Sequence, residues 1–224
     1  MPKLIDLSLP LTTNVTVVPG HPVLSFHPIH THDVHGRSNT EMHASIHTGT
    51  HCDPPYHFVP GGKTIDQMPL ERFMGEAVKI DLRRKVKPRT GITIEDVRTS
   101  PGFQEDESLK GRIVVFHTGW NRKMFGNPRY YFDNPFITTE LARWLVSKRI
   151  KALALDSPQD QVQGSGEPRP GDFPVHRTFL GKGIPFIEHL ANLHKVRQRT
   201  FTLIAFPIKI ERGDGAPCRA VAVV

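Results

Sequence analysis

One eleven-residue segment constrains this chain more than any other. It reads His-Thr-Gly-Thr-His-Cys-Asp-Pro-Pro-Tyr-His and runs from His47 to His57. Its imidazoles and carboxylate are the donors that Zn²⁺, Mn²⁺ and Fe²⁺ accept in proteins. A lone histidine on a strand is more often a structural residue, but this density of donors beside a glycine and two prolines favours a metal site.

The residues before the segment predict how its donors converge. Polar and less polar residues alternate over residues 39–47, which indicates a strand with one polar face. If extended backbone continues through Gly49, the side chains of His47, His51 and Asp53 share that face. These three residues are therefore the candidate metal ligands.

The remaining residues of the segment have separate expected roles. Pro54 and Pro55 stiffen and turn the chain, so that His57 approaches the same centre from another direction. Cys52 lies between two candidate ligands on an extended chain and is expected to point away from them into the core. His43 shares the polar face and either supports the site or lies on the surface.

The rest of the chain reads as short strands with few helices. Apolar runs rich in Val and Ile predict strands at residues 4–9, 77–82, 112–117, 151–156, 184–188, 202–210 and 219–224. Helical spacing predicts helices at residues 138–149 and 175–180, and composition predicts a loop at residues 164–171. The prediction is an α/β fold in a single domain over residues 1–224, with a mixed β-sheet core.

Composition excludes several classes of protein. The net charge of +7 raises the question of nucleic acid, but the basic clusters are not interleaved with aromatic residues, so a solvated surface is the preferred interpretation. No run of eighteen apolar residues predicts a membrane span. The first residues lack the apolar stretch of a signal peptide, and the chain has only 2 cysteines. We therefore expect a cytoplasmic protein that binds neither nucleic acid nor membrane.

The eleven-residue segment resembles the signature HxGTHxDxPxH of the cyclase-like metal-dependent hydrolases, a family that includes kynurenine formamidases and isatin hydrolases. The resemblance extends over nearly the whole chain. Its supporting stretches are residues 5–8, 18–20, 62–66, 70–73, 117–120, 155–158 and 209–215. It implies an α/β fold of the swivelling β/β/α type and a homo-oligomer, either a dimer or a tetramer.

The resemblance also implies roles for individual residues. It makes His47, His51 and Asp53 metal ligands and His57 the catalytic acid/base, and it adds His176 and Glu188 as ligands of a second ion. The cofactor would be a divalent metal, Zn or Mn, with one or two ions per chain.

The activity that the resemblance implies is hydrolysis of a small-molecule amide by metal-activated water, of the arylformamidase type with a substrate like N-formylkynurenine. In the formamidases a Trp precedes the Pro-Gly that corresponds to Pro19-Gly20, whereas this chain has Val18 as its candidate substrate-binding residue. Phe26, Tyr56 and Phe58 are candidates for an aromatic wall. One alternative is an isatin-like cyclic-amide hydrolase or another carbonyl hydrolase of the family, and an alternative of another class is a non-catalytic metal-binding protein.

Overall fold

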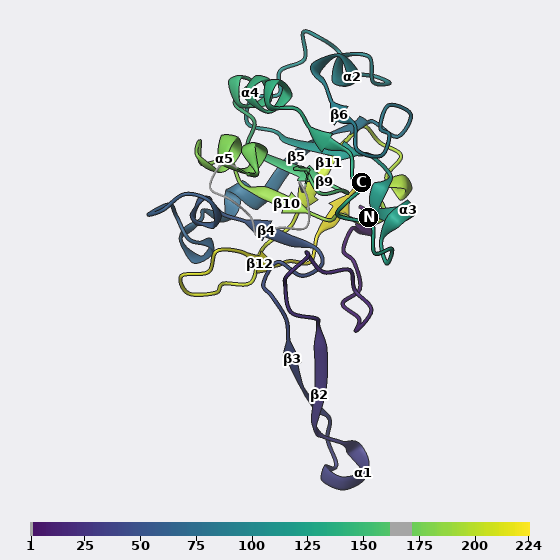
Figure 1. The fold of residues 1–224 in the computed structure, drawn as a ribbon, viewed down its shortest axis with the longest axis vertical. Coiled ribbons are helices and arrows are strands. Elements are labelled where there is room, and N and C mark those ends of the chain that lie inside the picture. The colour runs from purple at the N-terminus through teal and green to yellow at the C-terminus, as the bar shows by residue number, and fades with distance from the viewer. Residues whose placement is uncertain (1, 162–171) are drawn as a thin grey trace.

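The computed structural model describes residues 2–161 and 172–224. A nine-stranded mixed sheet runs through its body in the order β1-β13-β11-β5-β7-β9-β10-β4-β12 (Figure 1). In chain order these strands are β1 (Leu4–Asp6), β4 (His51–Asp53), β5 (Met74–Asp81), β7 (Ile113–His117), β9 (Ala152–Leu155), β10 (Phe186–Glu188), β11 (Thr200–Ile204), β12 (Ala216–Pro217) and β13 (Val221–Val223). The predicted mixed sheet is confirmed.

The four central strands explain the continuous apolar runs in the sequence. β5, β7, β9 and β10 are parallel to one another, whereas β11 and β4 pair antiparallel with the outer two. Each central strand is covered on both faces. On β7, Ile113 and Val115 belong to one hydrophobic cluster, and Val114 and Phe116 belong to the cluster on the other face. A strand buried in this way has no polar side.

Short helices cover one face of the sheet. α2 (Ile94–Arg98), α4 (Thr139–Ser147) and α5 (Pro174–Leu180) contribute to the same cluster as Val114 and Phe116. The hydroxyl of Thr138 accepts a hydrogen bond from the backbone N–H of Leu141 at 3.2 Å and so caps α4. Both predicted helices are confirmed, with slightly different ends. The remaining helical segments are α1 (His32–His35), α3 (Trp120–Met124), η1 (Pro55–His57), η2 (Ile65–Gln67), η3 (Leu70–Phe73) and η4 (Leu193–Lys195).

The structure differs from the sequence predictions in two further places. The strand expected at residues 202–210 ends at Ile204. Pro207 lacks the N–H that a sheet ladder needs, which prevents the ladder from continuing. Beyond Ile204, an isolated bridge joins Pro207 to Cys218. A two-residue parallel pair, β6 (Gly91–Ile92) with β8 (Phe136–Ile137), was not foreseen. The loop expected at residues 164–171 lies outside the described residues.

A two-stranded arm projects from the body (Figure 1). It consists of residues 25–43: β2 (Ser25–His30), the α1 turn and β3 (Asn39–His43). All of β3 is exposed, including Met42 at 47%. The prediction of one strand over residues 39–47 is wrong at its end, since β3 stops at His43.

In the part of the chain that the structure describes, none of the helices combines the length and apolar character needed to span a bilayer.

Candidate metal centre

β4 carries two candidate ligands on one face. His51 and Asp53 are two residues apart on extended backbone, so their side chains point to the same side. Cys52 points to the opposite side, where it is fully buried and its thiol donates a hydrogen bond to the carbonyl oxygen of Ala205 at 3.3 Å. The prediction that Cys52 packs in the core is confirmed.

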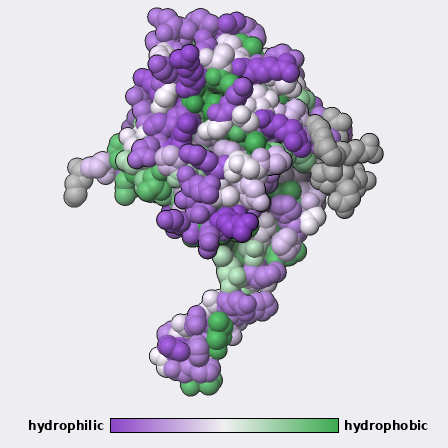
Figure 2. Space-filling view, turned by 90° about the vertical axis from the view of Figure 1, so that its left-hand side faces the viewer, coloured by the Kyte–Doolittle hydropathy of each residue, from purple (hydrophilic) through white to green (hydrophobic). Residues whose placement is uncertain are grey.

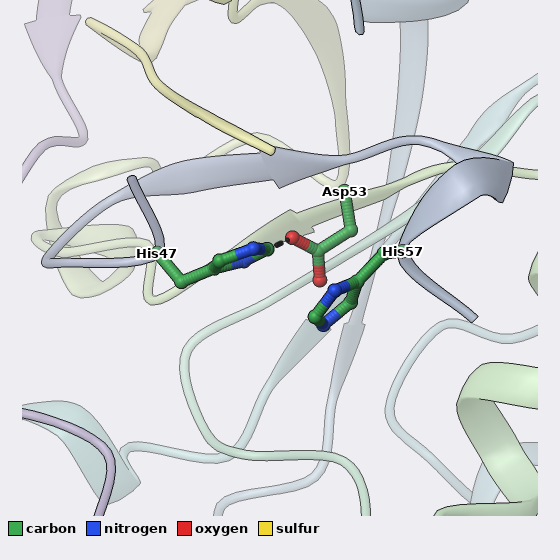
Figure 3. Close-up of side chains that lie close together, drawn as sticks. All are labelled: His47, Asp53 and His57. Carbon is green, nitrogen blue, oxygen red and sulfur yellow. Dashed lines mark hydrogen bonds and ion pairs between the residues drawn. The ribbon is translucent and has the colours of Figure 1, made fainter. Parts of the chain in front are cut away.

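His47 reaches the same face through a turn. Gly49 has a φ of 69°, in the left-handed region, and a Cβ there would lie 2.7 Å from Cδ2 of Leu11. The turn brings Nδ1 of His47 to 2.9 Å from Oδ1 of Asp53 (Figure 3). The expected convergence is therefore present, but the backbone that produces it is a glycine turn and not a continuous strand.

β10 delivers Glu188 beside β4. The two strands are antiparallel, with Glu188 opposite His51. Nε2 of His51 lies 3.3 Å from Oδ1 of Asp53 and 3.7 Å from Oε2 of Glu188. Its Nδ1 lies 2.8 Å from the carbonyl oxygen of Gly49, which can only accept a hydrogen bond. The proton on Nδ1 is thereby fixed, and Nε2 faces the two carboxylates.

His176 approaches from the first turn of α5. Its Nε2 lies 3.3 Å from Oε1 of Glu188 and 3.7 Å from Oδ2 of Asp53. Its Nδ1 lies 2.6 Å from Oδ2 of Asp160, which also accepts the backbone N–H of His176 at 3.1 Å. The structure thus places the other four candidate ligands around the carboxylate of Asp53.

His57 stands at the more open side of this cluster. Its ring stacks on His47 with centroids 4.1 Å apart, and its Nδ1 lies 3.7 Å from Oδ2 of Asp214. The His57 side chain is 23% exposed, whereas that of Asp53 is 1% exposed. Figure 3 shows His57 reaching toward Asp53 from η1, after the turn at Pro54 and Pro55.

The electrostatics of the cluster favour positive charge at its centre. Burial alone would lower the pKa of His47, but the charge of Asp53 and the hydrogen bond to Asp214 outweigh it and raise the pKa to about 10. Burial also opposes ionisation of Asp53, yet the neighbouring histidines, with His51 foremost, hold its pKa well below the usual range. Buried carboxylates of this kind need protons or a cation nearby.

The donor atoms suit a divalent cation. They form three groups, each with its ligand atoms within 4.8 Å of one another. The groups are His47, Asp53 and His57; Asp53, His176 and Glu188; and His51, Glu188 and His189. Oδ2 of Asp53 is buried without a hydrogen-bond partner among the described residues, which is unusual for a carboxylate oxygen. Imidazole nitrogens and carboxylate oxygens are the donors found in Zn²⁺ and Mn²⁺ sites, and Oδ2 of Asp53 is available to such an ion.

Three residues of the cluster were not foreseen as parts of it. The side-chain amide of Gln159 lies 2.7 Å from Nε2 of His176 and within hydrogen-bonding distance of Oε1 of Glu188. Asp160 and Asp214 each contact a candidate ligand histidine. All three come from segments without regular secondary structure, so no periodic pattern in the sequence could indicate them.

His189, for which the sequence predicts no role, shares a donor group with His51 and Glu188. Its ring nitrogens lie 2.9 Å and 3.3 Å from the hydroxyls of Tyr130 and Tyr131, and its Nε2 lies 3.6 Å from Oε2 of Glu188. Burial lowers the pKa of His189 to about 4, although Glu188 opposes the shift. His189 is therefore neutral at pH 7.

The candidate substrate-binding residues fall in different places. Val18 packs against the cluster of Trp120, Tyr130 and Tyr131, whose two tyrosines contact His189. Phe58 stacks on His176 with ring centroids 4.5 Å apart and contacts His57 edge-on. Phe26 lies on the exposed arm and Tyr56 is 42% exposed. Of the three aromatic candidates, Phe58 is thus the one that the structure places against the ligand histidines.

The alternative left open for His43 is resolved, and Asp156, which follows the buried strand β9, has a clear structural role. His43 is exposed on β3, so the surface interpretation holds. Asp156 accepts hydrogen bonds from the N–H and hydroxyl of Thr118 and from the N–H of Gly119, so it fixes a turn and is not one of the clustered donors.

Fold and site together define an α/β protein with a buried histidine–carboxylate centre suited to divalent cations. The model of the Cyclase family, described as "Putative cyclase", matches residues 5–160. The chain belongs to this family.

Known relatives extend the match over almost the whole chain. The kynurenine formamidase of Bacillus cytotoxicus is 27% identical over 221 residues, which are 97% of this chain and 95% of the relative. That of Geobacillus thermodenitrificans is 29% identical over 220 residues, or 96% and 95% of the two chains. Isatin hydrolase A from Labrenzia aggregata, solved with benzyl benzoate, superposes with a TM-score of 0.83 at 26% identity, covering 100% of this chain and 94% of its own. A structure described as a "predicted metal-dependent hydrolase" from Bacillus stearothermophilus gives 0.75 at 26% identity, covering 100% and 98%.

Proposed function

We propose that this chain is a metal-dependent hydrolase of small-molecule amides, most closely of the arylformamidase type. The observation that carries the proposal is the position of Asp53. Its buried Oδ2, which has no hydrogen-bond partner among the described residues, lies among the candidate ligands from β4, β10 and α5. The kynurenine formamidase and isatin hydrolase relatives, which match over nearly their full length, support the same reaction class.

His47 and His51, whose ring nitrogens lie 2.9 Å and 3.3 Å from Oδ1 of Asp53, are together with Asp53 the proposed ligands of one ion. Asp53, His176 and Glu188 are the proposed ligands of a second. A divalent cation at such a site lowers the pKa of water to about 7 and polarises a carbonyl oxygen. Zn and Mn are both compatible with this set of nitrogen and oxygen donors. Gln159, whose amide contacts Nε2 of His176 and Oε1 of Glu188, competes with the second ion for these two atoms.

His57 is the proposed acid/base. It is more exposed than the ligands, and its ring lies against His47. From there its imidazolium form can give a proton to the departing nitrogen of a cleaved amide, which is a poor leaving group without one. Positioned proton transfer of this kind contributes about 10² to 10⁴-fold to the rate.

The proposed substrate is a small amide with an aromatic part. Phe58, stacked on His176, offers an aromatic surface beside the donor cluster. Val18 lies where the formamidases carry a Trp, so the side chain that this position offers to a substrate is smaller and not aromatic. An aryl formamide such as N-formylkynurenine is the first candidate, and a cyclic amide such as isatin is the second.

Two measurements test the proposal. The metal-loaded protein is assayed with N-formylkynurenine, isatin and simple lactams, and His57→Ala is examined for both turnover and metal content. We expect hydrolysis of at least one of these amides, and we expect H57A to lose turnover while it keeps its metal. A protein that binds metal but hydrolyses none of them, with H57A unchanged, is a metal store. Loss of metal from H57A would make His57 a ligand.

We also propose that the chain forms a homo-oligomer through the arm. Five of the twelve large hydrophobic side chains that are exposed in the described residues lie in or beside it: Val23, Phe26, Ile29, Val34 and Met42. Figure 2 shows green, hydrophobic surface interspersed with purple on an extension that the body leaves uncovered. An isolated two-stranded hairpin is only marginally stable in water, so packing against a second copy would stabilise it. A cytoplasmic location and the absence of nucleic-acid and membrane partners stay predictions.

A further inference from the structure

We propose that Asp214 and Gly215 form a positioning turn that holds the imidazole of His47 in its metal-binding orientation and ties it to His57. The inference rests on the proposed function, because it assigns His47 as a ligand and His57 as the acid/base. It concerns two residues that contribute no donor to the three groups described above.

The carboxylate of Asp214 contacts both rings with one oxygen. Its Oδ2 lies 3.3 Å from Nε2 of His47 and 3.7 Å from Nδ1 of His57. Asp214 is 167 residues away from His47 in the sequence, so the contact is a product of the tertiary fold. The Asp214 side chain is 48% exposed.

The contact with Asp214 fixes which nitrogen of His47 faces the cluster. Nδ1 of His47 lies 2.9 Å from Oδ1 of Asp53, and Nε2 faces Asp214. A neutral imidazole that binds a cation through Nδ1 keeps its single proton on Nε2, and the Asp214 carboxylate accepts that proton's hydrogen bond. Carboxylates in this position orient ligating histidines and raise their basicity.

Gly215 constrains the same ring sterically. A Cβ at this position would lie 2.5 Å from Cε1, 2.9 Å from Nε2 and 3.0 Å from Nδ1 of His47. The backbone of the turn therefore lies directly against the imidazole, while the His57 ring stacks on it at 4.1 Å. The preceding Gly213 secures the turn, because its carbonyl oxygen accepts a hydrogen bond from the N–H of Ile65 at 2.9 Å.

Four variants test this inference: Asp214→Ala, Asp214→Asn, Gly215→Ala and, as the matched control, Glu211→Ala, which removes an exposed acid from the same segment. The probe is Co²⁺ alone, titrated into metal-free protein, with the visible absorption of the bound ion as the readout. We expect D214A and G215A to weaken Co²⁺ binding about 10- to 100-fold and to alter the spectrum, because the ring is no longer held. D214N keeps an acceptor oxygen and should recover most of the affinity. E211A should match the unaltered chain.

Kinetics add a second readout on the best amide substrate. D214A should lower kcat at nearly constant KM, because Asp214 acts through two histidines and does not bind substrate. Co²⁺ binding by D214A that is as tight as that of the unaltered chain, with the same spectrum, would overturn the inference. If D214A does not fold, G215A and D214N decide the matter through the same titration. If no amide is hydrolysed at all, the proposed function fails, while the Co²⁺ titration still tests the turn.

Discussion

Nδ1 of His176 lies 2.6 Å from Oδ2 of Asp160. The same carboxylate accepts the backbone N–H groups of Val175 at 3.0 Å and His176 at 3.1 Å, so it holds both the first turn of α5 and the imidazole that this turn presents. One carboxylate thereby couples the start of a helix to the orientation of a candidate ligand, which makes Asp160 a direct target for mutation.

Replacing Asp160 with Asn should separate the two halves of the candidate centre. Asn has only one acceptor oxygen, and its N–H₂ group can only donate, so it cannot accept from the N–H of Val175 and from both the N–H and Nδ1 of His176, and the ring loses its fixed orientation. We expect affinity for the ion held by Asp53, His176 and Glu188 to fall about 10- to 100-fold, and the free energy of unfolding to fall by about 1 kcal/mol through α5.

Metal content after dialysis against graded Zn²⁺, together with thermal unfolding of the metal-free protein, measures both effects of D160N. The control is Asp106→Asn, which changes an exposed acid outside the cluster. An unchanged zinc content at every concentration would remove His176 from the ligand set.

Gln159 should limit binding of a second ion. Its amide lies 2.7 Å from Nε2 of His176 and is hydrogen-bonded to Oε1 of Glu188, so an ion that binds both atoms must displace these contacts. Each hydrogen bond contributes about 0.5 to 1.5 kcal/mol. Gln159→Ala should therefore raise the affinity for the second ion about tenfold, and calorimetric titration with Mn²⁺ or Zn²⁺ would show it as a second binding event at lower concentration.

The matched control for Gln159→Ala is Gln104→Ala, which truncates an exposed glutamine far from the cluster. A loss of affinity in Q159A would have the opposite meaning: the carbonyl oxygen of Gln159 would be a ligand of the second ion.

The arm offers a separate test of self-association. Phe26 and Met42 are opposite each other in the register of β2 and β3, so their side chains share one face of the arm, and both are exposed. Phe26→Ser with Met42→Ser should shift the protein toward the monomer in sedimentation velocity, because apolar area would no longer be removed from water on association. Ile208→Ser, which alters an exposed apolar residue outside the arm, is the control. A monomer at all concentrations before any mutation would remove the arm's proposed role.

The sequence predicts the buried strands better than the exposed ones, for a physical reason. β7 and β9 have apolar side chains on both faces, so their composition alone marks them. β2 and β3 are exposed on both faces and carry no such mark; the alternation before His47 continues past the true end of β3. Buried strands are apolar in local composition and can be predicted from it, whereas the strands of an exposed arm are not.

The residues of the candidate site also differ in whether the sequence predicts them. His47, His51, Asp53 and His57 lie in one segment, and their density alone predicts a centre there. His176 and Glu188 could be predicted only through the family resemblance. Gln159, Asp160 and Asp214 reach the centre from irregular segments, and their positions depend on how distant elements pack. The structure supplies these contacts.

The last prediction concerns acid sensitivity and lies outside the metal centre. His117 ends β7, is 3% exposed, and its Nδ1 has no hydrogen-bond partner among the described residues. Burial, aided by the nearby Arg83 and opposed by Asp81, lowers the pKa of His117 to about 4. The unfolded chain therefore takes up a proton near pH 6.5, while the folded chain does not do so until about pH 4.

The contribution of neutral His117 to stability is thus fully present above pH 6.5 and is lost as the pH falls from 6.5 to 4. The loss amounts to about 3 kcal/mol at the acid end of this window. His117→Phe keeps a ring without a titrating group and should flatten the pH dependence of the unfolding free energy over that interval. Urea unfolding of the metal-free protein at pH 7, 6, 5 and 4 measures it. His32→Gln, which alters an exposed histidine of the arm, should leave the curve as it was. Parallel curves for H117F and the unaltered chain would mean that His117 is protonated in the fold.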